Sequence, residues 1–438
     1  MSEAVDLLIE PRWVVPIEPQ GSVLEAHSVA VRNGRIIAVL PAETARSRFA
    51  AEKVVKLPEH VLLPGMVNAH THAAMALLRG LGDDLPLMRW LQEAIWPAEA
   101  RLVSADFVHD GTLLACAEML RGGVTCFSDM YFFPEAAARA AARAGMRCVL
   151  GIIAIEFPSA YASDADDYLA KGLAARDAWR GDPLVNFSMA PHAPYTVSDR
   201  TFGRVLMLAE QLDLPIHLHI HETTHEIEQS ISQHGVRPIE RLRGLGLVGP
   251  SLIGVHAVHL SHDEVDLLAR NACSVVHCPS SNMKLASGIA PVRQFKDAGI
   301  RVALGSDGAA SNNRLDMLQE MRQSALLSKV ATGDASSLPA HDSLRMATLD
   351  GAASLGLGEQ IGSIESGKLA DLIAIDLGDW IAAPCFDPAS HVVYVAGREQ
   401  VSHVWVGGQP RMLDKALLQF NNTDLRRISK LWQNKLVT

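Results

Sequence analysis

Aromatic residues, cysteine and basic charge are all scarce in this sequence of 438 residues. Phe, Trp and Tyr together make up 5% of the chain, and the six cysteines stand apart with no CxxC pair. In a chain of this length that pattern predicts buried, reduced thiols and excludes a dense disulfide framework. Lys and Arg number 39 against 49 Asp and Glu, which gives a formal net charge of −10. We therefore expect no binding to nucleic acid, which needs a basic surface.

Long hydrophobic runs are missing as well. Apolar stretches such as residues 149–155 are far shorter than the ~20 residues of a membrane helix, so we expect no contact with a membrane. The first residues contain no basic segment followed by an apolar core, so we read no signal peptide. Together with the scattered cysteines, these absences predict a cytoplasmic protein.

The sequence does contain a regular alternation between about residue 64 and residue 310. Short apolar runs are each followed by a longer stretch of helical character, which indicates a parallel sheet buried between helices. Eight such units favour an α/β fold in the form of a closed (β/α)₈ TIM-like barrel; the alternative is a doubly wound open sheet. The runs are 63–70, 123–129, 147–155, 184–190, 215–220, 252–258, 274–277 and 301–305.

The two ends of the chain differ from this central block. They contain short β-like segments at residues 5–9, 28–32, 35–39, 369–375, 391–395 and 401–406, separated by turn signals such as Asn33-Gly34. We predict that residues 1–63 and 368–438 form one small, discontinuous β-sandwich domain. The catalytic barrel, residues 64–367, is then inserted between its halves.

Polar residues follow the predicted strands at the points where they end. A barrel collects the carboxyl ends of its strands at one face, where its active site lies, so these side chains should converge. An open sheet would gather its ligands at one crevice rather than from nearly every strand. The residues are His70 and His72 after the first run, Asp129 after the second, His192 after the fourth, His219 and Glu222 after the fifth, His256 in the sixth and Asp307 after the eighth.

A His-x-His pair at a strand end is typical of a metal site. Side chains alternate along a strand, so His70 and His72 share a face and can reach one metal ion. The fifth run places His217, His219 and His221 on one face in the same way, and by periodicity any of them could be the third ligand. All three together with His70 and His72 would overfill a tetrahedral zinc ion, so at least one must support the site from behind.

The remaining residues at the strand ends suit proton transfer. Glu222 has the character of a proton shuttle, and Asp307 can both touch a metal and accept a proton from its bound water. His256 can polarise a substrate or hold a hydroxide. Cys278, beside His277, is interpreted as a small apolar residue near a strand end rather than as a nucleophile.

Over nearly its whole length the sequence resembles the amidohydrolase superfamily and, within it, the 5-methylthioadenosine/S-adenosylhomocysteine deaminases. The blocks that carry the resemblance are long and occur in the same order. They are PGMVNAHTH, LRGLGDDLPLMRWL, GVTCFSDMYF, SMAPHAPYT, HLHIHET, GVHAVHL, CPSSNMKLASGIAP, LGSDGAASNN and GSIESGKLADL.

The resemblance assigns roles residue by residue. It implies one Zn²⁺ per subunit with the ligands His70, His72, His219 and Asp307, and it selects His219 because the family's ligand precedes the catalytic Glu by three positions. Glu222 matches that Glu, and His256 and Asp307 match the other catalytic residues; Glu222 and Asp307 also contact the substrate. His192 matches a substrate-contacting histidine, and Glu99 matches the carboxylate that holds the ribose hydroxyls. Read by itself, Glu99 would be a solvated helix residue.

Two further features bear on metal number and assembly. Two-metal relatives use a carboxylated lysine on the fourth strand, and the run 184–190 contains none, which supports a single metal. Relatives often form dimers or larger assemblies, so the resemblance also implies a homo-oligomer.

The region after the third strand departs from the family pattern. Members that accept S-adenosylhomocysteine are expected to supply an arginine there for the amino-acid carboxylate. Residues 151–161 are largely apolar and carry Glu156 instead, and Arg147 belongs to the strand start, where it should face away from the site. We therefore predict zinc-dependent hydrolytic deamination of 5′-methylthioadenosine to 5′-methylthioinosine, with adenosine as a further substrate and S-adenosylhomocysteine as a weaker one.

Two alternatives stay open. Guanine deaminases and triazine chlorohydrolases share this scaffold and its metal site, but they would not need Glu99. A non-catalytic ligand-binding protein on the same scaffold is an alternative of another class. The presence of the full ligand set with Glu222 and His256 argues against it.

Overall fold

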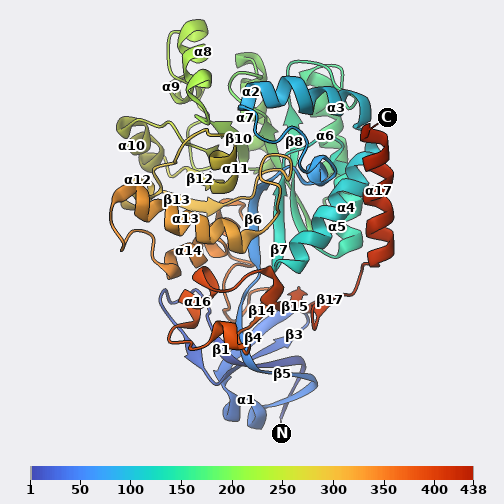
Figure 1. The fold of residues 1–438 in the computed structure, drawn as a ribbon, viewed down its shortest axis with the longest axis vertical. Helices are drawn as coiled ribbons and strands as arrows, with labels where there is room; N and C mark the ends of the chain where they lie inside the picture. The colour runs from blue at the N-terminus through green and yellow to red at the C-terminus, as the bar shows by residue number, and fades with distance from the viewer. Residues whose placement is uncertain (1, 438) are drawn as a thin grey trace.

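A computed structural model describes residues 2–437, which form a barrel and a smaller β-rich part (Figure 1). In Figure 1 the β-rich part lies at the lower end with the N-terminus, and the barrel fills the rest of the molecule. The last helix, α17 (Asn422–Val437), runs along the side of the barrel.

Eight strands form the barrel, and every neighbouring pair in their sheet is parallel. Their residues are almost all buried, as expected for strands covered on both faces. The predicted (β/α)₈ barrel is therefore confirmed. The strands are β6 (Met66–Thr71), β7 (Val124–Asp129), β8 (Arg147–Ala154), β9 (Val185–Pro191), β10 (Ile216–Ile220), β11 (Leu252–His256), β12 (Ser274–His277) and β13 (Arg301–Leu304).

Hydrogen bonds just beyond β13 link the last strand to the first. The Asp307 amide donates to the His70 carbonyl over 3.0 Å, and Asn68 and Ser306 exchange hydrogen bonds of 2.7 and 2.9 Å. Gly305 permits this close approach, because a Cβ at that position would lie 2.8 Å from the Cβ of His70. The closure of the barrel thus brings Asp307 beside His70.

Helices form the outer layer of the barrel. They are α4 (Ala105–Arg121), α5 (Pro134–Ala144), α6 (Ala165–Trp179), α7 (Asp199–Leu212), α8 (Thr224–His234), α9 (Pro238–Gly244), α10 (His262–Arg270), α11 (Pro279–Lys284), α12 (Val292–Asp297), α13 (Met317–Thr332), α14 (Ala340–Met346) and α15 (Leu349–Ser354). Between β6 and α4 the chain adds four short elements, which lie beyond the strand ends: η1 (Ala73–Leu78), α2 (Leu87–Trp90), η2 (Leu91–Ile95) and α3 (Trp96–Leu102). In Figure 1, α2, α3, α8 and α9 stand at the end of the barrel opposite the β-rich part.

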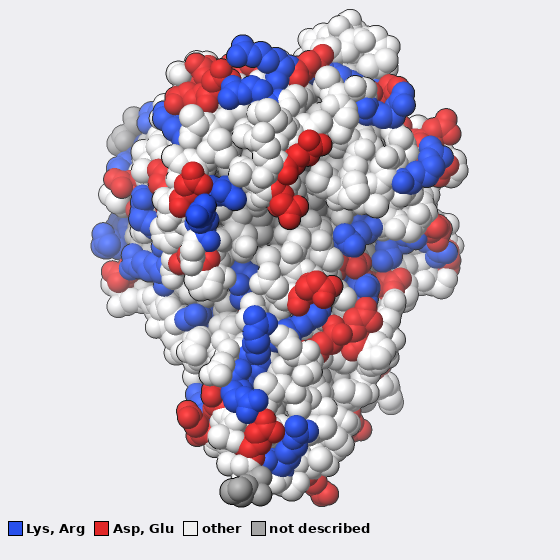
Figure 2. Space-filling model, turned by 180° about the vertical axis from the view of Figure 1, so that it is seen from behind, with Lys and Arg blue, Asp and Glu red and all other residues white. Residues whose placement is uncertain are grey.

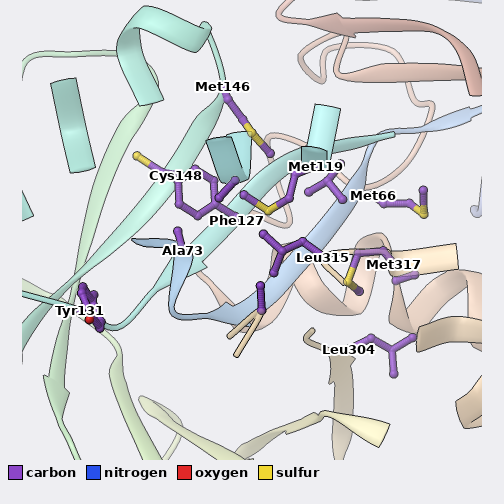
Figure 3. Packing of buried hydrophobic residues seen from close by; sticks show 14 of the residues in the cluster. Met66, Ala73, Met119, Phe127, Tyr131, Met146, Cys148, Leu304, Leu315 and Met317 are labelled. Carbon is purple, nitrogen blue, oxygen red and sulfur yellow. The ribbon is translucent and has the colours of Figure 1, made fainter. Parts of the chain in front are cut away.

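The core compensates for the scarcity of aromatic residues with methionine and small side chains. Figure 3 shows Met66, Met119 and Met146 together with Phe127 in the largest buried cluster. Methionine fills irregular gaps because its side chain is unbranched and flexible. In α5 the buried face consists mostly of alanine, which lets this helix pack closely against α4 and β8.

The β-rich part is built from both ends of the chain, as predicted. Its nine strands form one mixed sheet in which β5 pairs with β1 in parallel and with β14 in antiparallel fashion. A buried cluster with members such as Ile9, Leu62, Leu372 and Trp405 joins the two ends. The strands are β1 (Glu3–Val14), β2 (Leu24–Glu25), β3 (His27–Arg32), β4 (Arg35–Pro41), β5 (Phe49–Pro64), β14 (Leu372–Asp376), β15 (Val401–Val406), β16 (Gln409–Leu413) and β17 (Ala416–Leu417); the short helix α1 (Ala42–Arg48) follows β4.

One segment expected to be β is helical. Residues 391–395 lie in or directly after α16 (Pro388–Tyr394), because Asp387 caps its first turn, accepting from the Ala389 amide over 2.9 Å, and Pro388 occupies its first position. Helix α16 packs against α13 and α14, and two single turns, η3 (Trp380–Ala382) and η4 (Arg398–Gln400), flank it.

Helix α17 also packs against the barrel, on α3 and α4. The Trp432 side chain is buried, stacks edge-to-face on Phe107 and donates to Asp110 over 2.9 Å. The Arg101 guanidinium of α3 donates to the Leu436 carbonyl over 2.7 Å. The segment 368–438 therefore supplies the β-rich part and also two helices to the barrel. The division at residues 63/64 and 367/368 stays a prediction, and residues 1 and 438 lie outside the described part.

Three observations concern charge, thiols and membranes. On the face drawn in Figure 2, acidic and basic side chains are interspersed. The six cysteines lie within the described residues; none is in a disulfide, and five are buried. Residues 2–437 contain no helix with the length and apolar character of a membrane span.

Candidate active site

Three histidine side chains converge where the barrel strands end. His70 comes from β6, His72 follows it at the start of η1, and His219 comes from β10. One ligand nitrogen from each lies within 4.8 Å of the others. The structure thus gathers three of the four predicted metal ligands, and it places the fourth, Asp307, beside them.

The spacing of these atoms fits a tetrahedral ion. His70 Nε2 lies 3.2 Å from His219 Nε2 and 3.4 Å from Asp307 Oδ1, and His72 Nε2 lies 3.2 Å from the same oxygen. Four ligands bound about 2.0–2.2 Å from a tetrahedral zinc ion would stand about 3.3–3.6 Å apart. Three imidazoles and one carboxylate are also a donor set that suits zinc.

In two of the three rings, the opposite nitrogen fixes which nitrogen faces the centre. The Nδ1 atoms of His72 and His219 donate to the carbonyls of Met130 (2.6 Å) and His192 (2.7 Å). A carbonyl can only accept, so the proton sits on Nδ1 and the lone pair of Nε2 points at the centre. His70 Nδ1 contacts His217 Nε2 at 2.9 Å.

Among these groups, the pKa values favour a positive charge at the contact between His72 and Asp307. Burial lowers the pKa of His70 to about 4 and that of His219 well below its ordinary range. Burial also opposes a charge on His72, but the adjacent Asp307 carboxylate outweighs it and raises the pKa of His72 to about 9. Burial would raise the pKa of Asp307, yet hydrogen bonds from His70 and His72 hold it well below its usual value. A bound cation would take the place of the proton between His72 and Asp307.

Hydrogen bonds to both carboxylate oxygens hold Asp307 in place. Ser281 Oγ and Ser311 Oγ donate to its Oδ2 over 2.6 and 2.7 Å, and the Gly308 amide donates to Oδ1 over 2.8 Å. The backbone at Asp307 has a φ of +60°, a left-handed conformation that costs a non-glycine residue of order 1–3 kcal/mol. The surrounding hydrogen bonds offset this cost and keep Oδ1 turned toward the histidines.

The side chains of Glu222 and His256 face each other beside the point where the metal ligands converge. His256 Nε2 lies 3.8 Å from Glu222 Oε2, and its Nδ1 is hydrogen-bonded to Asn282 Oδ1 at 2.8 Å. Burial raises the pKa of Glu222, so this side chain holds a proton more readily than an ordinary glutamate. Glu226 fixes the turn that carries Glu222 by accepting from the amides of His221 and Glu222 over 3.0 and 2.9 Å.

The structure separates the three candidate histidines of the fifth strand. His217 lies behind His70, with its Nδ1 3.4 Å from Ser128 Oγ. His221 turns away: its Nε2 accepts from the Ile239 amide over 3.0 Å, and its Nδ1 lies 3.3 Å from the His259 carbonyl. Only His219 among them contributes a nitrogen to the cluster of ligand atoms; His217 contacts the far side of the His70 ring.

A cavity with mostly apolar walls opens above this centre. His72, His219, Glu222, His256 and Asp307 lie at its inner end. Its walls come from the β6–α4 insertion and from the segments after β7, β8, β9, β12 and β13; the remaining lining residues are Met75, Leu87, Trp90, Leu91, Ile95, Trp96, Glu99, Met130, Tyr131, Phe132, Ile153, Ile155, Phe157, His192, Tyr195, Thr196, Leu285 and Ser311.

All four predicted substrate contacts line this cavity; Glu222 and Asp307 lie at its inner end, and Glu99 and His192 lie in its wall. Glu99, on α3, is half-buried and accepts a 2.6 Å hydrogen bond from Tyr131 Oη. Burial raises the pKa of Glu99, and the Tyr131 hydrogen bond works in the opposite direction. His192 Nδ1 is 3.0 Å from Thr196 Oγ1, and burial lowers the pKa of His192 to about 3, so its ring is neutral.

Other residues discussed from the sequence lie outside the reacting centre. Asp129 accepts from the Ala73 amide over 2.7 Å and so fixes the turn after His72. Arg147 pairs with buried Asp371 through its Nε at 3.0 Å, away from the cavity, as predicted. Burial raises the pKa of Cys278 well above its ordinary value, which agrees with a structural thiol.

Sequence reasoning missed the residues that hold the centre from behind. Asn282 orients His256, Ser281 and Ser311 hold Asp307, Glu226 fixes Glu222 and Tyr131 contacts Glu99. The blocks CPSSNMK and LGSDGAASNN contain three of them as polar residues next to predicted strand ends, which was a usable signal. Glu226 lies four residues after Glu222 and could have been found as a cap of the helix start.

Known proteins share this arrangement. Residues 61–411 match the amidohydrolase family. A 5-methylthioadenosine/S-adenosylhomocysteine deaminase of Saccharophagus degradans is 44% identical over 431 residues, which cover 98% of this chain and 97% of the relative. The crystal structure of an adenosine deaminase from Xanthomonas campestris with bound zinc is 50% identical, covers 100% of this chain and 99% of its own, and has a TM-score of 0.98.

A more distant structure shares the fold alone. The zinc complex of an atrazine chlorohydrolase from Arthrobacter aurescens has a TM-score of 0.90 at 22% identity, covering 97% of this chain and 99% of its own. The match over most of the chain and the identity to full-length relatives lead to one conclusion. The chain belongs to the amidohydrolase family, within it to the 5-methylthioadenosine/S-adenosylhomocysteine deaminases, and is a metal-dependent aminohydrolase.

Proposed function

We propose that this enzyme removes the 6-amino group of adenine nucleosides by hydrolysis, with 5′-methylthioadenosine as its main substrate. Water supplies the oxygen that forms the new bond to C6, the bond from C6 to the amino nitrogen breaks, and ammonia leaves. The products are 5′-methylthioinosine and ammonia. The names of the relatives and the cavity lined by His72, Glu99 and Glu222 support this proposal.

The proposed cofactor is one Zn²⁺ per subunit, with His70, His72, His219 and Asp307 as ligands. The spacing of these donors and the preference of the His72–Asp307 pair for a positive charge support the assignment. When bound, the ion supplies a water molecule whose pKa is lowered toward about 7.

The chain's own residues move the protons. Asp307 is ionised and faces the centre, so it accepts the proton of the attacking water. His256 carries its proton on Nδ1 against Asn282 Oδ1, which leaves Nε2 to accept a hydrogen bond from the attacking oxygen. Glu222, whose pKa is raised by burial, donates its proton to the ring nitrogen next to C6. Asp307 then passes the proton it took from water to the amino group, which leaves as ammonia. The proton on the ring nitrogen stays in the product, and the proton of the C6 hydroxyl returns to Glu222 as the carbonyl forms.

Glu99 and His192 would hold the sugar of the substrate. Glu99 is an acceptor at the cavity wall, held by Tyr131, and it suits the two adjacent hydroxyls of a ribose. Neutral His192 offers a ring nitrogen beside His219.

One observation supports the preference for a methylthio group. No Lys or Arg side chain among the described residues lines the cavity, whose acidic members are Glu99, Glu222 and Asp307. The amino-acid tail of S-adenosylhomocysteine carries a carboxylate, which would enter this cavity without a cationic partner and pay its desolvation cost. Glu156 lies in the segment that should supply an arginine in members that accept S-adenosylhomocysteine, and its carboxylate accepts a hydrogen bond from the Ser198 amide over 2.9 Å.

A panel of substrates tests the proposal. The purified enzyme would be assayed with adenosine, 5′-methylthioadenosine and S-adenosylhomocysteine by the loss of absorbance of the 6-amino chromophore, with metal analysis on the same sample. We expect the highest kcat/KM for 5′-methylthioadenosine. Comparable kcat/KM for S-adenosylhomocysteine would refute the preference.

Replacement of Glu99 separates nucleosides from other substrates. Glu99→Gln should cripple the turnover of nucleosides and have little effect on a free base or a triazine. Glu93→Gln, on the exposed side of the same insertion, is the matched control.

Three expectations from the sequence stay predictions. They are localisation in the cytoplasm, assembly into a homo-oligomer and the absence of nucleic-acid binding.

A further inference from the structure

A second hollow adjoins the substrate cavity at its outer end. We call it the side pocket; its lining residues are Trp96, Glu99, Ala100, Val103, Phe132, Phe157, Pro158, Ser159 and Ala160. One wall is helix α3, and the other is the loop that follows β8. Four of these residues, Trp96, Glu99, Phe132 and Phe157, also line the substrate cavity, so the two spaces adjoin each other at these side chains.

The side pocket is apolar apart from Glu99. Its other side chains are aromatic or aliphatic, together with the small residue Ser159, and it holds no Lys or Arg among the described residues. Trp96 and Phe157 are 40% and 46% exposed, although large aromatic side chains are usually covered. Two exposed aromatic residues at the border between two adjoining hollows form a surface that an apolar ligand group would cover.

The position of Glu99 indicates which part of a ligand lies there. Under the proposed function the base lies against Glu222 and His256, and Glu99 holds the ribose. The part of the nucleoside that extends beyond the ribose is its 5′ substituent. The stretch Phe157–Ala160 follows β8, whose Ile153 lines the substrate cavity, so the apolar wall continues outward from the site of the methylthio group.

We propose that the side pocket binds 5′-thioether substituents larger than methyl, so that the enzyme accepts adenine nucleosides with neutral alkylthio or arylthio groups at C5′. This inference rests on the proposed deaminase function. The hollow has a volume of about 520 Å³, several times the roughly 150 Å³ of a cavity that holds one benzene ring. A charged amino-acid tail would meet the Glu99 carboxylate without any cationic partner, so size alone does not admit it.

The expected selectivity follows from apolar burial. Each methylene group transferred from water into such a pocket gains about 0.8 kcal/mol, which corresponds to about a fourfold increase in kcat/KM when the group is fully buried. Because the side pocket is open to solvent on one side, we expect a smaller increase, of about twofold per methylene.

The test uses the full-length, zinc-loaded enzyme and a homologous series of substrates. These are 5′-methylthio-, 5′-propylthio- and 5′-benzylthio-5′-deoxyadenosine, with adenosine and S-adenosylhomocysteine as references. We expect kcat/KM for the propylthio and benzylthio compounds to equal or exceed that for the methylthio compound. A decrease of more than tenfold from methylthio to propylthio, with the methylthio compound still turned over, would overturn this inference and leave the proposed function intact. If the enzyme deaminated none of these adenine nucleosides, both this inference and the proposed function would be overturned.

Two variants locate the effect. Ala100→Phe on α3 and Ala160→Phe on the facing loop fill the side pocket from opposite walls, and both replace exposed alanines. Each should lower the ratio of benzylthio to methylthio kcat/KM at least tenfold. Ala331→Phe, at an exposed position of α13 outside both hollows, is the matched control and should leave the ratio unchanged. If both pocket variants keep the wild-type ratio, the side pocket does not bind the substituent, and the proposal is overturned.

Discussion

Replacing Tyr131 by phenylalanine removes the hydroxyl that donates a 2.6 Å hydrogen bond to Glu99 and keeps the ring in place. A hydrogen bond to a charged group contributes about 1.5–3 kcal/mol. Glu99 is only half-buried, which places this bond toward the lower end of that range. At about 1.4 kcal/mol per factor of ten, we expect kcat/KM for 5′-methylthioadenosine to fall about 10- to 30-fold.

The loss should depend on pH in a definite direction. The Tyr131 hydrogen bond lowers the pKa of Glu99, so its removal lets Glu99 become protonated at higher pH. A protonated Glu99 holds the ribose hydroxyls less well, so the defect should be largest at low pH and should shrink as pH rises. The assay is steady-state kinetics across pH, and the defect should fall mainly on KM.

Tyr161→Phe is the matched control for this experiment. The Tyr161 hydroxyl is also buried, but it has no hydrogen-bond partner among the described residues, so this variant should stay within about twofold of wild type. A Tyr131→Phe enzyme with wild-type kcat/KM at every pH would refute the role given to the Tyr131–Glu99 pair. A loss confined to kcat and independent of pH would refute it as well.

Three further predictions address the metal, the proton shuttle and the barrel base. His219→Ala should remove a metal ligand, so the purified protein should contain little zinc and show no deamination, whereas chelated wild-type enzyme should recover on addition of Zn²⁺; retained activity in metal-free protein would contradict the site. Glu222→Gln should lower kcat by about 10²–10⁴-fold while metal content stays near wild type, because the variant lacks the transferable proton but keeps the ligands. Arg147→Met should lower the free energy of unfolding by about 3–5 kcal/mol, because Asp371 is left buried without its partner. Arg147→Met with Asp371→Leu should recover most of that loss in urea denaturation, and no recovery would show that the pair matters for another reason.

Much of the catalytic centre could be predicted from the sequence because it follows from strand ends. The alternation of apolar runs and helices gave the barrel, and the barrel rule placed His70, His256 and Asp307 at one face. Periodicity alone could not separate His217 from His219, since both point to the same side of β10. They differ in depth, which depends on how β10 is staggered against its neighbours: His217 pairs with Ile253 and His219 with Val255. That stagger is a property of the closed sheet and not of one strand.

The cavity walls and the outer helices were harder to predict. Residues 391–395 read as a strand because they are rich in valine, but Asp387 and Pro388 start a helix there, and this capping signal was overlooked. Helix α17 was missed although Ile428 and Trp432 are spaced as one face of a helix. The pairing of Tyr131 with Glu99 joins the segment after β7 to helix α3, 32 residues apart in the sequence, and no local pattern predicts it.

The packing of α17 on α3 has a consequence for the order in which this enzyme becomes active during synthesis. Helix α3 carries Glu99, and its Arg101 is fixed by the carbonyl of Leu436, 335 residues later. Strand β5 likewise gains its antiparallel partner β14 only when residues 372–376 have been made. A nascent chain that already contains all eight barrel strands therefore still lacks the support behind one wall of its substrate cavity. A chain that stalls or ends before α17 should therefore form the barrel and still show less deaminase activity than the full chain.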